Sequence, residues 1–336
     1  MSYTNLLFIK NFGLTEIRDF SDLAFKLSIS SSRLYSLVYK KDKFYKKALI
    51  PKKNGENRVL CIPTFSMKTV QAWIYEHILK KIDVSEYSMA FVPGKNGLLE
   101  SAKKHSKSVF LLEMDIHDFF GSIEKYKVQL LFMKVGYASS VASLLAELCT
   151  YEDVLPQGAV TSPYLANLLS HSLDARIEGI CKRRSILYSR YADDLCFSSD
   201  DIIKLKKIKP IITSIVEDEG FTVNENKTRF LSNSRKKSVV GITINNGEIH
   251  ANGNLKKAIR AKINSAITSG DYQEKDRIIG MIAFVTSIEK GYKDKIIKYI
   301  KSIIDKDFVC SNKNLVNAFN HNKFYKELPN CKYVRK

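Results

Sequence analysis

Two adjacent carboxylates inside an otherwise apolar stretch constrain this chain more than any other feature. The segment Tyr191-Ala192-Asp193-Asp194 follows the strand formers of residues 185–191, and Leu195-Cys196-Phe197-Ser198 then resumes an extended pattern. Neighbouring side chains of a regular strand point to opposite faces, so two consecutive aspartates serve one metal cluster best where a turn re-aims the backbone. The pattern predicts a divalent-metal site at the tip of a β-hairpin. Aspartate is also a common turn residue, and for the motif alone that simpler interpretation is open.

A third carboxylate, Asp115, ends the apolar run of residues 109–114. Unpaired burial of a carboxylate is costly, so Asp115 needs a cation, a metal or the solvent-facing end of its strand, and a plain strand-end cap remains an alternative. Together with Asp193 and Asp194 it supplies three carboxylates from distant segments. Magnesium prefers hard oxygen ligands, and two ions about 4 Å apart can activate a hydroxyl and stabilise a leaving phosphate oxygen.

The charge of the chain predicts a polyanionic partner. Of 336 residues, 54 are Lys or Arg and 35 are Asp or Glu, a net charge of +19, while 45% hydrophobic residues suffice for a folded core. Nucleic acid is therefore the expected partner, with an affinity that falls with salt. No apolar run reaches membrane-spanning length and the N-terminus lacks the pattern of a signal peptide, so we expect a cytoplasmic protein without a membrane partner.

Cysteine and histidine exclude two other kinds of site. The six cysteines are scattered singly, with no close pair that would clamp zinc. The six histidines are dispersed as well, and none stands with Ser or Cys in a nucleophile motif. The sequence therefore favours neither a zinc site nor hydrolase chemistry of that type.

The order of predicted elements is a mixture of helices and strands. Helices are expected within residues 1–50, a basic hairpin turning at Asn54-Gly55, and strands at 221–223 and 239–244. From about residue 251 onward strands disappear, and residues 251–336 hold 18 basic and 8 acidic side chains, a net +10. This charge either keeps a helical module soluble or tracks a nucleic-acid backbone, and its concentration favours the second. The mixture predicts an α+β fold rather than a doubly wound parallel sheet.

The same residues resemble the motifs of the reverse transcriptases, in the expected order over roughly residues 50 to 245. Tyr191-Ala192-Asp193-Asp194 resembles the family's Tyr-x-Asp-Asp motif, and residues 114–120 resemble the preceding catalytic strand. The resemblance implies that Asp115, Asp193 and Asp194 are catalytic and that, with the backbone carbonyl of Ile116, they bind two Mg²⁺ ions. A primer hydroxyl would then attack the α-phosphate of a dNTP.

Further motifs imply a place for the nucleotide. Leu155-Pro156-Gln157-Gly158 followed by Ser162-Pro163 resembles the family's dNTP and template motif, which implies that Gln157 lies near the incoming nucleotide. Lys53 and Arg58 match the triphosphate contacts, although Lys52 could replace Lys53. Phe120 stands where the family has an aromatic gate against the 2′-hydroxyl, although core packing also explains an aromatic residue there. The remaining dNTP-binding candidates are Asp118, Phe119, which is also expected to pack in the core, and Lys227, for which a surface lysine is the alternative.

The compact length resembles the bacterial retron group within this family. Retron enzymes have an Asn-Ala-x-x-His motif where this chain has Ser101-Ala102-Lys103-Lys104-His105, and Val-Thr-Gly where it has Val239-Val240-Gly241. Each matches at two of three positions, which makes Ser101, Ala102, His105, Val239, Val240 and Gly241 candidates for RNA recognition. His105 could equally lie on a helix surface, and Gly241 could mark close backbone approach.

The resemblance implies a right-hand polymerase fold with fingers, an antiparallel palm sheet with helices, and a helical thumb. We expect N-terminal helices and fingers in residues 1–108, palm in 109–250 with further fingers helices at about 124–155, and a basic thumb in 251–336. The implied activity copies part of a structured noncoding RNA (msr-msd) from a guanosine 2′-hydroxyl into branched, RNA-linked single-stranded DNA (msDNA). An effector protein and a role in defence against phage are implied by kinship alone. The rivals are another small reverse transcriptase, from a group II intron, a diversity-generating element or an abortive-infection system, and a non-catalytic RNA-binding scaffold.

Overall fold

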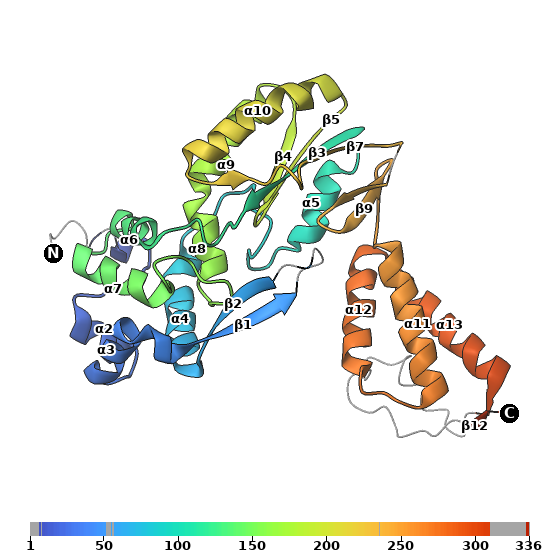
Figure 1. Cartoon of the computed structure of the whole chain (residues 1–336), viewed down its shortest axis with the longest axis horizontal. Coiled ribbons are helices and arrows are strands. Elements are labelled where there is room, and N and C mark those ends of the chain that lie inside the picture. Colours follow the sequence, from blue (N-terminus) through green and yellow to red (C-terminus); the bar gives the residue numbers. More distant parts are fainter. Residues whose placement is uncertain are drawn as a thin grey trace. The chain divides into compact units, whose positions relative to one another are not determined.

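The structure is a computed structural model of the chain (Figure 1). It describes residues 7, 9–51, 55, 57–234, 236–309 and 334–335. Within these residues no helix is both long and apolar enough to cross a bilayer.

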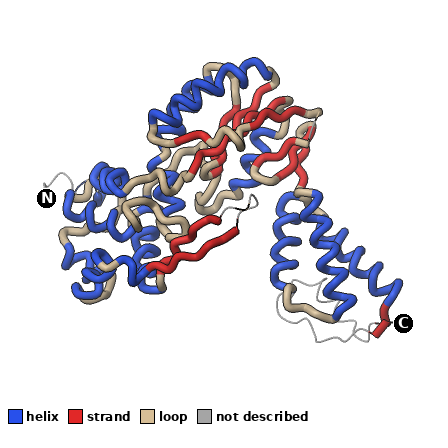
Figure 2. The backbone as a smooth tube through the Cα atoms, in the orientation of Figure 1, coloured by secondary structure: helices blue, strands red, loops and turns tan. Residues whose placement is uncertain are grey.

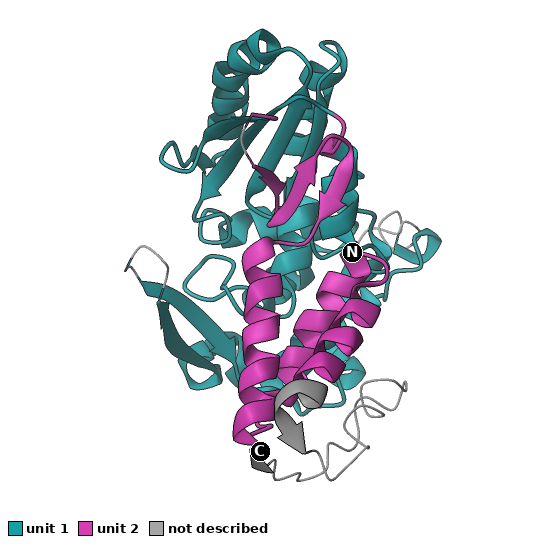
Figure 3. Ribbon diagram, turned by 90° about the vertical axis from the view of Figure 1, so that its right-hand side faces the viewer, with its two compact units in different colours: residues 1–104, 108–232 teal, residues 105–107, 233–336 magenta. Residues whose placement is uncertain are grey.

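The described residues divide into two compact units (Figure 3). Unit 1 takes in residues up to 104 and from 108 to 232, and unit 2 takes in 105–107 and residues from 233 onward. The short segment 105–107 belongs to unit 2 because the Gly247 amide donates to the Ser106 carbonyl at 3.1 Å. The expected boundaries of fingers, palm and thumb stay a prediction.

The first part of unit 1 is mainly helical and includes the expected hairpin. Strands β1 and β2 pair antiparallel from Tyr45 opposite Pro63 to Pro51 opposite Asn57. The α-helices and these strands of the first part are, in chain order, α2 (Phe20–Lys26), α3 (Ser31–Tyr39), β1 (Tyr45–Pro51), β2 (Asn57–Pro63), α4 (Phe65–His77), α5 (Gly97–His105), α6 (Lys125–Lys134) and α7 (Ser139–Cys149). Two short 3-10 helices, η1 (Lys41–Phe44) and η2 (Leu79–Lys81), flank the hairpin and α4.

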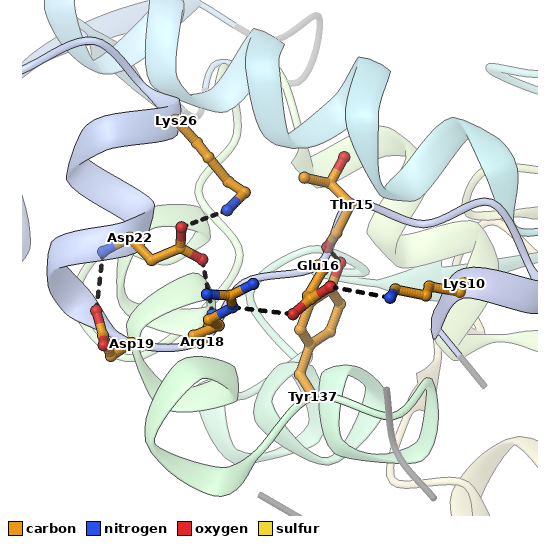
Figure 4. A network of polar contacts seen from close by, with 8 residues as sticks. All are labelled: Lys10, Thr15, Glu16, Arg18, Asp19, Asp22, Lys26 and Tyr137. Carbon is orange, nitrogen blue, oxygen red and sulfur yellow. Dashed lines mark hydrogen bonds and ion pairs between the residues drawn. The ribbon is translucent and has the colours of Figure 1, made fainter. Parts of the chain in front are cut away.

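Side-chain contacts tie the N-terminal segment to this helical part (Figure 4). The Asp19 carboxylate caps α2 by accepting from the Asp22 amide at 2.8 Å, as expected of Asp at an N-cap. Asp22 in turn accepts from the Arg18 amide at 2.8 Å. The Tyr137 hydroxyl, which follows α6, donates to the Thr15 carbonyl at 2.7 Å. The segment before α2 is thus held by both local and distant contacts.

The centre of unit 1 is a five-stranded antiparallel sheet (Figure 2). Its order is β4-β5-β3-β6, with β7 also paired to β3, beyond the residues that pair with β6. Helices α9 and α10 pack against these strands. The elements are β3 (Phe110–His117), α8 (Ser162–Leu169), α9 (His171–Lys182), β4 (Leu187–Tyr191), β5 (Asp194–Ser199), α10 (Ile202–Asp218), β6 (Thr222–Val223) and β7 (Arg229–Ser232).

Strand β3 lies inside the sheet and is apolar on both faces. Leu111, Leu112, Met114 and Ile116 are each at most 1% exposed. A central strand that is covered on both faces has apolar residues at successive positions. For this reason the sequence of residues 109–114 does not alternate between apolar and polar residues. Two carboxylates interrupt this run, Asp115, which is 6% exposed, and the half-buried Glu113.

Unit 2 combines a small sheet with three helices. Strands β8 (Lys237–Val239), β9 (Ile242–Asn245) and β10 (Glu248–His250) form an antiparallel meander. Helices α11 (Gly253–Ser269), α12 (Lys275–Ile288) and α13 (Tyr292–Asp307) share a core that includes Ile259, Ile282 and Ile296. The short strands β11 (Phe308–Val309) and β12 (Val334–Arg335) pair with each other.

Two expectations for unit 2 were wrong. The single strand expected at residues 239–244 is two strands, because the chain turns at Val240 (φ +48°) and Gly241 (φ +82°). A β-branched residue rarely adopts a positive φ and favours strands. Val240 therefore led to the prediction of a continuous strand where the chain turns. The expectation that strands disappear after residue 251 also fails, at β11 and β12. The α+β class itself is confirmed, since the sheets are antiparallel and mixed with helices.

Candidate functional site

The Tyr191–Asp194 motif forms the two-residue turn of the β4–β5 hairpin. Tyr191 and Asp194 are Cα partners across the hairpin, so Ala192 and Asp193 make the turn and Asp194 begins β5. Ala192 has φ +56°, the left-handed conformation that such a turn requires. The predicted position of the two aspartates at a hairpin tip is confirmed.

Asp115 is brought to this turn by the register of the sheet. It is the Cα partner of Asp194 in the antiparallel pairing of β3 with β5. Beyond that pair, the Ile116 amide donates to the Asp193 carbonyl at 2.9 Å. The register therefore brings Asp115, about 80 positions before Asp193 and Asp194, to the same end of the sheet as those two residues.

Burial and the neighbouring negative charges make these carboxylates harder to ionise. Desolvation, followed by the charges of Asp193, Asp115 and Glu113, raises the pKa of Asp194 to about 7. Desolvation also raises the pKa of Asp193, and the charge of Asp115 adds to it. Like charges held together in this way disfavour ionisation unless a cation is near.

A lysine supplies part of that positive charge. Lys227, in the turn after β6, donates from its ammonium to both oxygens of Asp115, at 3.0 and 2.8 Å. The bond to Asp115 raises the pKa of Lys227, with smaller contributions from Asp193 and Asp194. The Lys227 side chain is 60% exposed, so it can move away from Asp115 without breaking any packing in the core.

The three carboxylates fit a divalent cation by their chemistry. They are hard oxygen donors, and a divalent cation would offset the repulsion that raises the pKa of Asp194. In the described part of the chain, no group of three or more His, Cys, Asp or Glu side chains is placed so that it could hold a metal ion. The Ile116 carbonyl as a further ligand stays a prediction.

The nucleotide candidates gather partly around the hairpin β1–β2. Arg58 lies exposed on β2, and its charge reaches Asp193, whose pKa it lowers. The loop that contains Gln157 lies against the same strand, since the Cys61 amide donates to the Gln157 carbonyl at 2.8 Å. Gly158 has φ +118°, and a Cβ there would lie 3.0 Å from the Cys61 carbonyl oxygen, so glycine permits this close approach. Lys53 and its alternative Lys52 lie outside the described residues.

The segment after β3 places an acid and two aromatic rings in different surroundings. Asp118 is exposed at φ +41°, and a Cβ on Gly121 would lie 2.1 Å from its carboxylate. Phe119 is 3% exposed and packs on Phe221, with ring centroids 5.6 Å apart. Phe120 is only partly buried. The expected packing role of Phe119 is confirmed, whereas the role of Phe120 as a gate stays a prediction.

Most of the RNA-recognition candidates are buried. Ser101, Ala102 and His105 on α5 are each 0% exposed, and the Ser101 hydroxyl lies 3.0 Å from that of Ser189. The surface alternative for His105 is therefore excluded. Val239 is 1% exposed, whereas the turn residues Val240 and Gly241 reach the surface. A role of these residues in RNA recognition stays a prediction.

Sequence reasoning missed two ion pairs that lie close in sequence to the three aspartates. Glu113 lies two residues before Asp115 and bonds Arg229 of β7 at 2.5 Å, across the pair of strands. Arg190, directly before the motif, is fully buried with Asp174 of α9. Arg190 stands near the end of a strand with buried side chains. This position could have predicted an acidic partner, because a buried cation requires one.

Unit 2 contains a basic pocket at the start of α11. Its volume is about 270 Å³. It is lined by Gly253, Lys256, Lys257, Arg260, Glu289, Tyr292 and Lys295. Glu289 pairs with Lys256 at 2.8 Å, and among the described residues the Tyr292 hydroxyl, although buried, has no hydrogen-bond partner. Cations, a helix N-terminus and an unpartnered hydroxyl together suit an anion.

The chain is similar to known proteins along most of its length. The family model described as reverse transcriptase (RNA-dependent DNA polymerase) matches residues 50–244. The retron Ec86 reverse transcriptase of Escherichia coli is 33% identical over 90% of this chain and 94% of its own length. The retron Mx65 reverse transcriptase of Myxococcus xanthus is 29% identical over 86% of this chain and 72% of its own. A solved Candida albicans telomerase, in complex with a TWJ fragment of telomeric RNA, is similar at 13% identity and a TM-score of 0.48, over 82% of this chain and 63% of that one.

The family match covers strand β2, the central sheet and the three aspartates. It confirms the right-hand polymerase fold and an RNA-directed DNA polymerase, an activity that in general requires an RNA template, dNTP substrates and a divalent metal. The match with the retron Ec86 enzyme spans 90% of this chain. The chain therefore belongs to the reverse transcriptase family and, within it, to the retron reverse transcriptases.

Proposed function

We propose that this enzyme makes msDNA, copying part of its own msr-msd RNA from the 2′-hydroxyl of a guanosine. The product is a branched RNA joined to single-stranded DNA. The relation to retron enzymes supports this substrate. The observation that carries the catalytic assignment is the register that pairs Asp115 with Asp194 beside Asp193.

The proposed chemistry assigns a task to each residue of the site. Asp115, Asp193 and Asp194, with the Ile116 carbonyl, hold two Mg²⁺ ions, which supply activation of the primer hydroxyl and stabilisation of the leaving phosphate. Arg58 and Lys227, with Lys53, neutralise the triphosphate, because developing negative charge is best stabilised by prearranged cations. Gln157 and Asp118 border the nucleotide, and Phe120 opposes a 2′-hydroxyl.

The helical unit 2 is the proposed thumb and binds nucleic-acid backbone. The basic pocket supports this, because it is lined by Lys257 and Lys295, which form no ion pair with any described residue and can contact phosphate oxygens. Recognition of the RNA is then largely by shape and backbone.

The biological role is proposed from kinship with retrons. The enzyme and its msDNA act in the cytoplasm with an effector protein, in defence against phage. Phage plating on cells that carry the intact locus or an Asp193→Asn Asp194→Asn version tests the role. Equal plating on both would contradict defence while leaving DNA synthesis untouched.

Sequencing the nucleic acid that copurifies with the protein tests the substrate. A branched RNA–DNA species supports the proposal, and linear RNA from an intron or a variable-repeat gene points to another small reverse transcriptase. Primer extension with dNTPs and Mg²⁺ on an RNA template tests the site. Activity that survives Asp193→Asn with Asp194→Asn contradicts the residue assignment, and an inactive wild type favours a binding scaffold.

A further inference from the structure

Arg190 and Asp174 form an ion pair without any exposure to solvent, one residue before the Tyr191–Asp194 motif. The guanidinium donates from Nε and Nη2 to the two carboxylate oxygens, at 2.8 and 2.7 Å. The Tyr188 hydroxyl donates to the same carboxylate at 2.8 Å. Such a pair is tolerable in a core only when its hydrogen bonds are satisfied, and here Asp174 accepts from two neighbours.

The remaining nitrogen of the guanidinium reaches the turn itself. Nη1 of Arg190 donates to the Asn167 side-chain carbonyl at 3.1 Å and to the Ala192 carbonyl at 3.3 Å. Asn167, fully buried on α8, donates in turn to the Ala90 carbonyl at 2.7 Å. One side chain therefore links the turn to helices α8 and α9.

The backbone of Arg190 is fixed as well. Its amide donates to the Tyr87 carbonyl and its carbonyl accepts from the Met89 amide, both at 2.8 Å. Strand β4 is the edge of the sheet, so these bonds occupy its open side. The backbone from which the guanidinium projects is therefore fixed by hydrogen bonds on both edges of β4.

The turn depends on such support because of its conformation. Ala192 has φ +56°, which disfavours any residue with a Cβ. Asp193 comes next, and its carbonyl accepts from Ile116 beside Asp115. Any shift of the Ala192 peptide therefore moves Asp193 relative to Asp115.

We propose that Arg190 is a positioning residue for polymerisation, which holds the Ala192 carbonyl and thereby sets where Asp193 lies. This inference rests on the proposed role of the aspartates. Stability alone does not call for an ion pair here, since apolar side chains of similar volume often stabilise a core as well. The guanidinium also lies 5.9 Å from the ring centroid of Phe119, so it borders the segment after β3 too.

The test replaces the pair without leaving a buried charge or an unpaired hydroxyl. In the triple variant Arg190→Met, Asp174→Leu, Tyr188→Phe we expect a folded protein with a modestly lower melting temperature, because the buried Asn167 carbonyl loses its donor, and unchanged affinity for a template–primer duplex. We expect kcat per active enzyme to fall on the order of 10 to 100-fold, because small misplacements of catalytic groups cost that much. Mn²⁺ binding to the nucleotide-free protein, followed by electron paramagnetic resonance, should weaken.

Arg176→Met is the matched control. Arg176 lies on the same helix as Asp174. At the surface it forms ion pairs with Asp218 and Glu219, at 2.7 and 2.9 Å. It should keep wild-type kcat and Mn²⁺ affinity. A folded triple variant with both values at the wild-type level would overturn the positioning role.

A second variant decides the matter if the triple variant does not fold. Arg190→Lys keeps the charge but loses the planar fork that reaches Asp174 and Ala192 together. Lower kcat with weaker Mn²⁺ binding at an unchanged melting temperature supports the proposal, and wild-type values refute it. Failure of the proposed function looks different, since Asp193→Asn would then retain primer extension in the otherwise native chain.

Discussion

The Lys227 ammonium donates hydrogen bonds to both carboxylate oxygens of Asp115, at 3.0 and 2.8 Å. This ion pair ties the turn after β6 to the strand that holds the first of the three aspartates. A cation that binds Asp115 competes with Lys227, because both require the same oxygens. Lys227 can then turn to a neighbouring phosphate, since its side chain is mostly exposed.

Lys227→Gln should separate these two tasks. We expect tighter Mn²⁺ binding in the absence of nucleotide, because the competing ammonium is gone, and a KM for dNTP raised about tenfold, because a phosphate contact is lost. Calorimetry measures the first and steady-state kinetics the second. Lys209→Gln is the control, since Lys209 pairs with Glu225 at 2.8 Å on the surface. An unchanged KM would remove Lys227 from the nucleotide site.

Arg58→Ala should raise the KM for dNTP by roughly 10 to 100-fold with a smaller effect on kcat. The reason is that an exposed guanidinium within electrostatic reach of Asp193 suits a triphosphate held above the aspartates. The comparison is Lys47→Ala on β1 of the same hairpin, where the ammonium already pairs with Glu152 at 2.6 Å. Equal effects of the two variants would mean that only the general charge of the hairpin matters.

Phe120→Val should weaken the choice of dNTP over rNTP by about 10 to 100-fold, because a smaller side chain leaves room for a 2′-hydroxyl. Single-nucleotide incorporation of dCTP and CTP measures the ratio of kcat/KM values. Phe230→Val is the control, because Phe230 is an exposed aromatic residue on β7. Selectivity that stays at the wild-type level in Phe120→Val would leave Phe120 with a packing role only.

Lys257→Ala with Lys295→Ala should reduce the salt dependence of RNA binding. The slope of log K against log salt is negative, and each lost phosphate contact makes it less negative by about 0.7 to 0.9. The matched control is Lys262→Ala with Arg277→Ala, which removes the same charge from two residues that already pair with Glu274. Equal slopes for the two double variants would show that net charge, not the basic pocket, governs binding.

Gly97→Ala should lower the free energy of unfolding by at least about 1 to 3 kcal/mol, because the new methyl group would overlap the backbone of Met89. A Cβ at Gly97 would lie 1.7 Å from the Met89 carbonyl oxygen, so the backbone itself would have to move. Gly179→Ala on α9, where a Cβ meets nothing within 4 Å, should not destabilise the protein. Urea unfolding followed by circular dichroism measures both variants.

The sequence by itself determined the chemistry and the local form of the site. Alternating apolar residues on both sides of Asp193 and Asp194 predicted a hairpin, and an apolar run before Asp115 predicted a buried strand, because strand patterns depend on neighbours in sequence. Ordered motifs then identified the family. Val240 shows the limit of such patterns, since its positive φ is set by the turn it occupies and contradicts its own preference for strand.

Only the tertiary structure decided which distant groups meet. The register of β3 on β5 places Asp115 opposite Asp194, and no local pattern encodes the partner of a strand. The same holds for Arg190, whose buried partner Asp174 lies on another element, and for the contact of Lys227 with Asp115. Charges in a core are fixed by three-dimensional pairing, because each must find its counterion wherever the fold brings one.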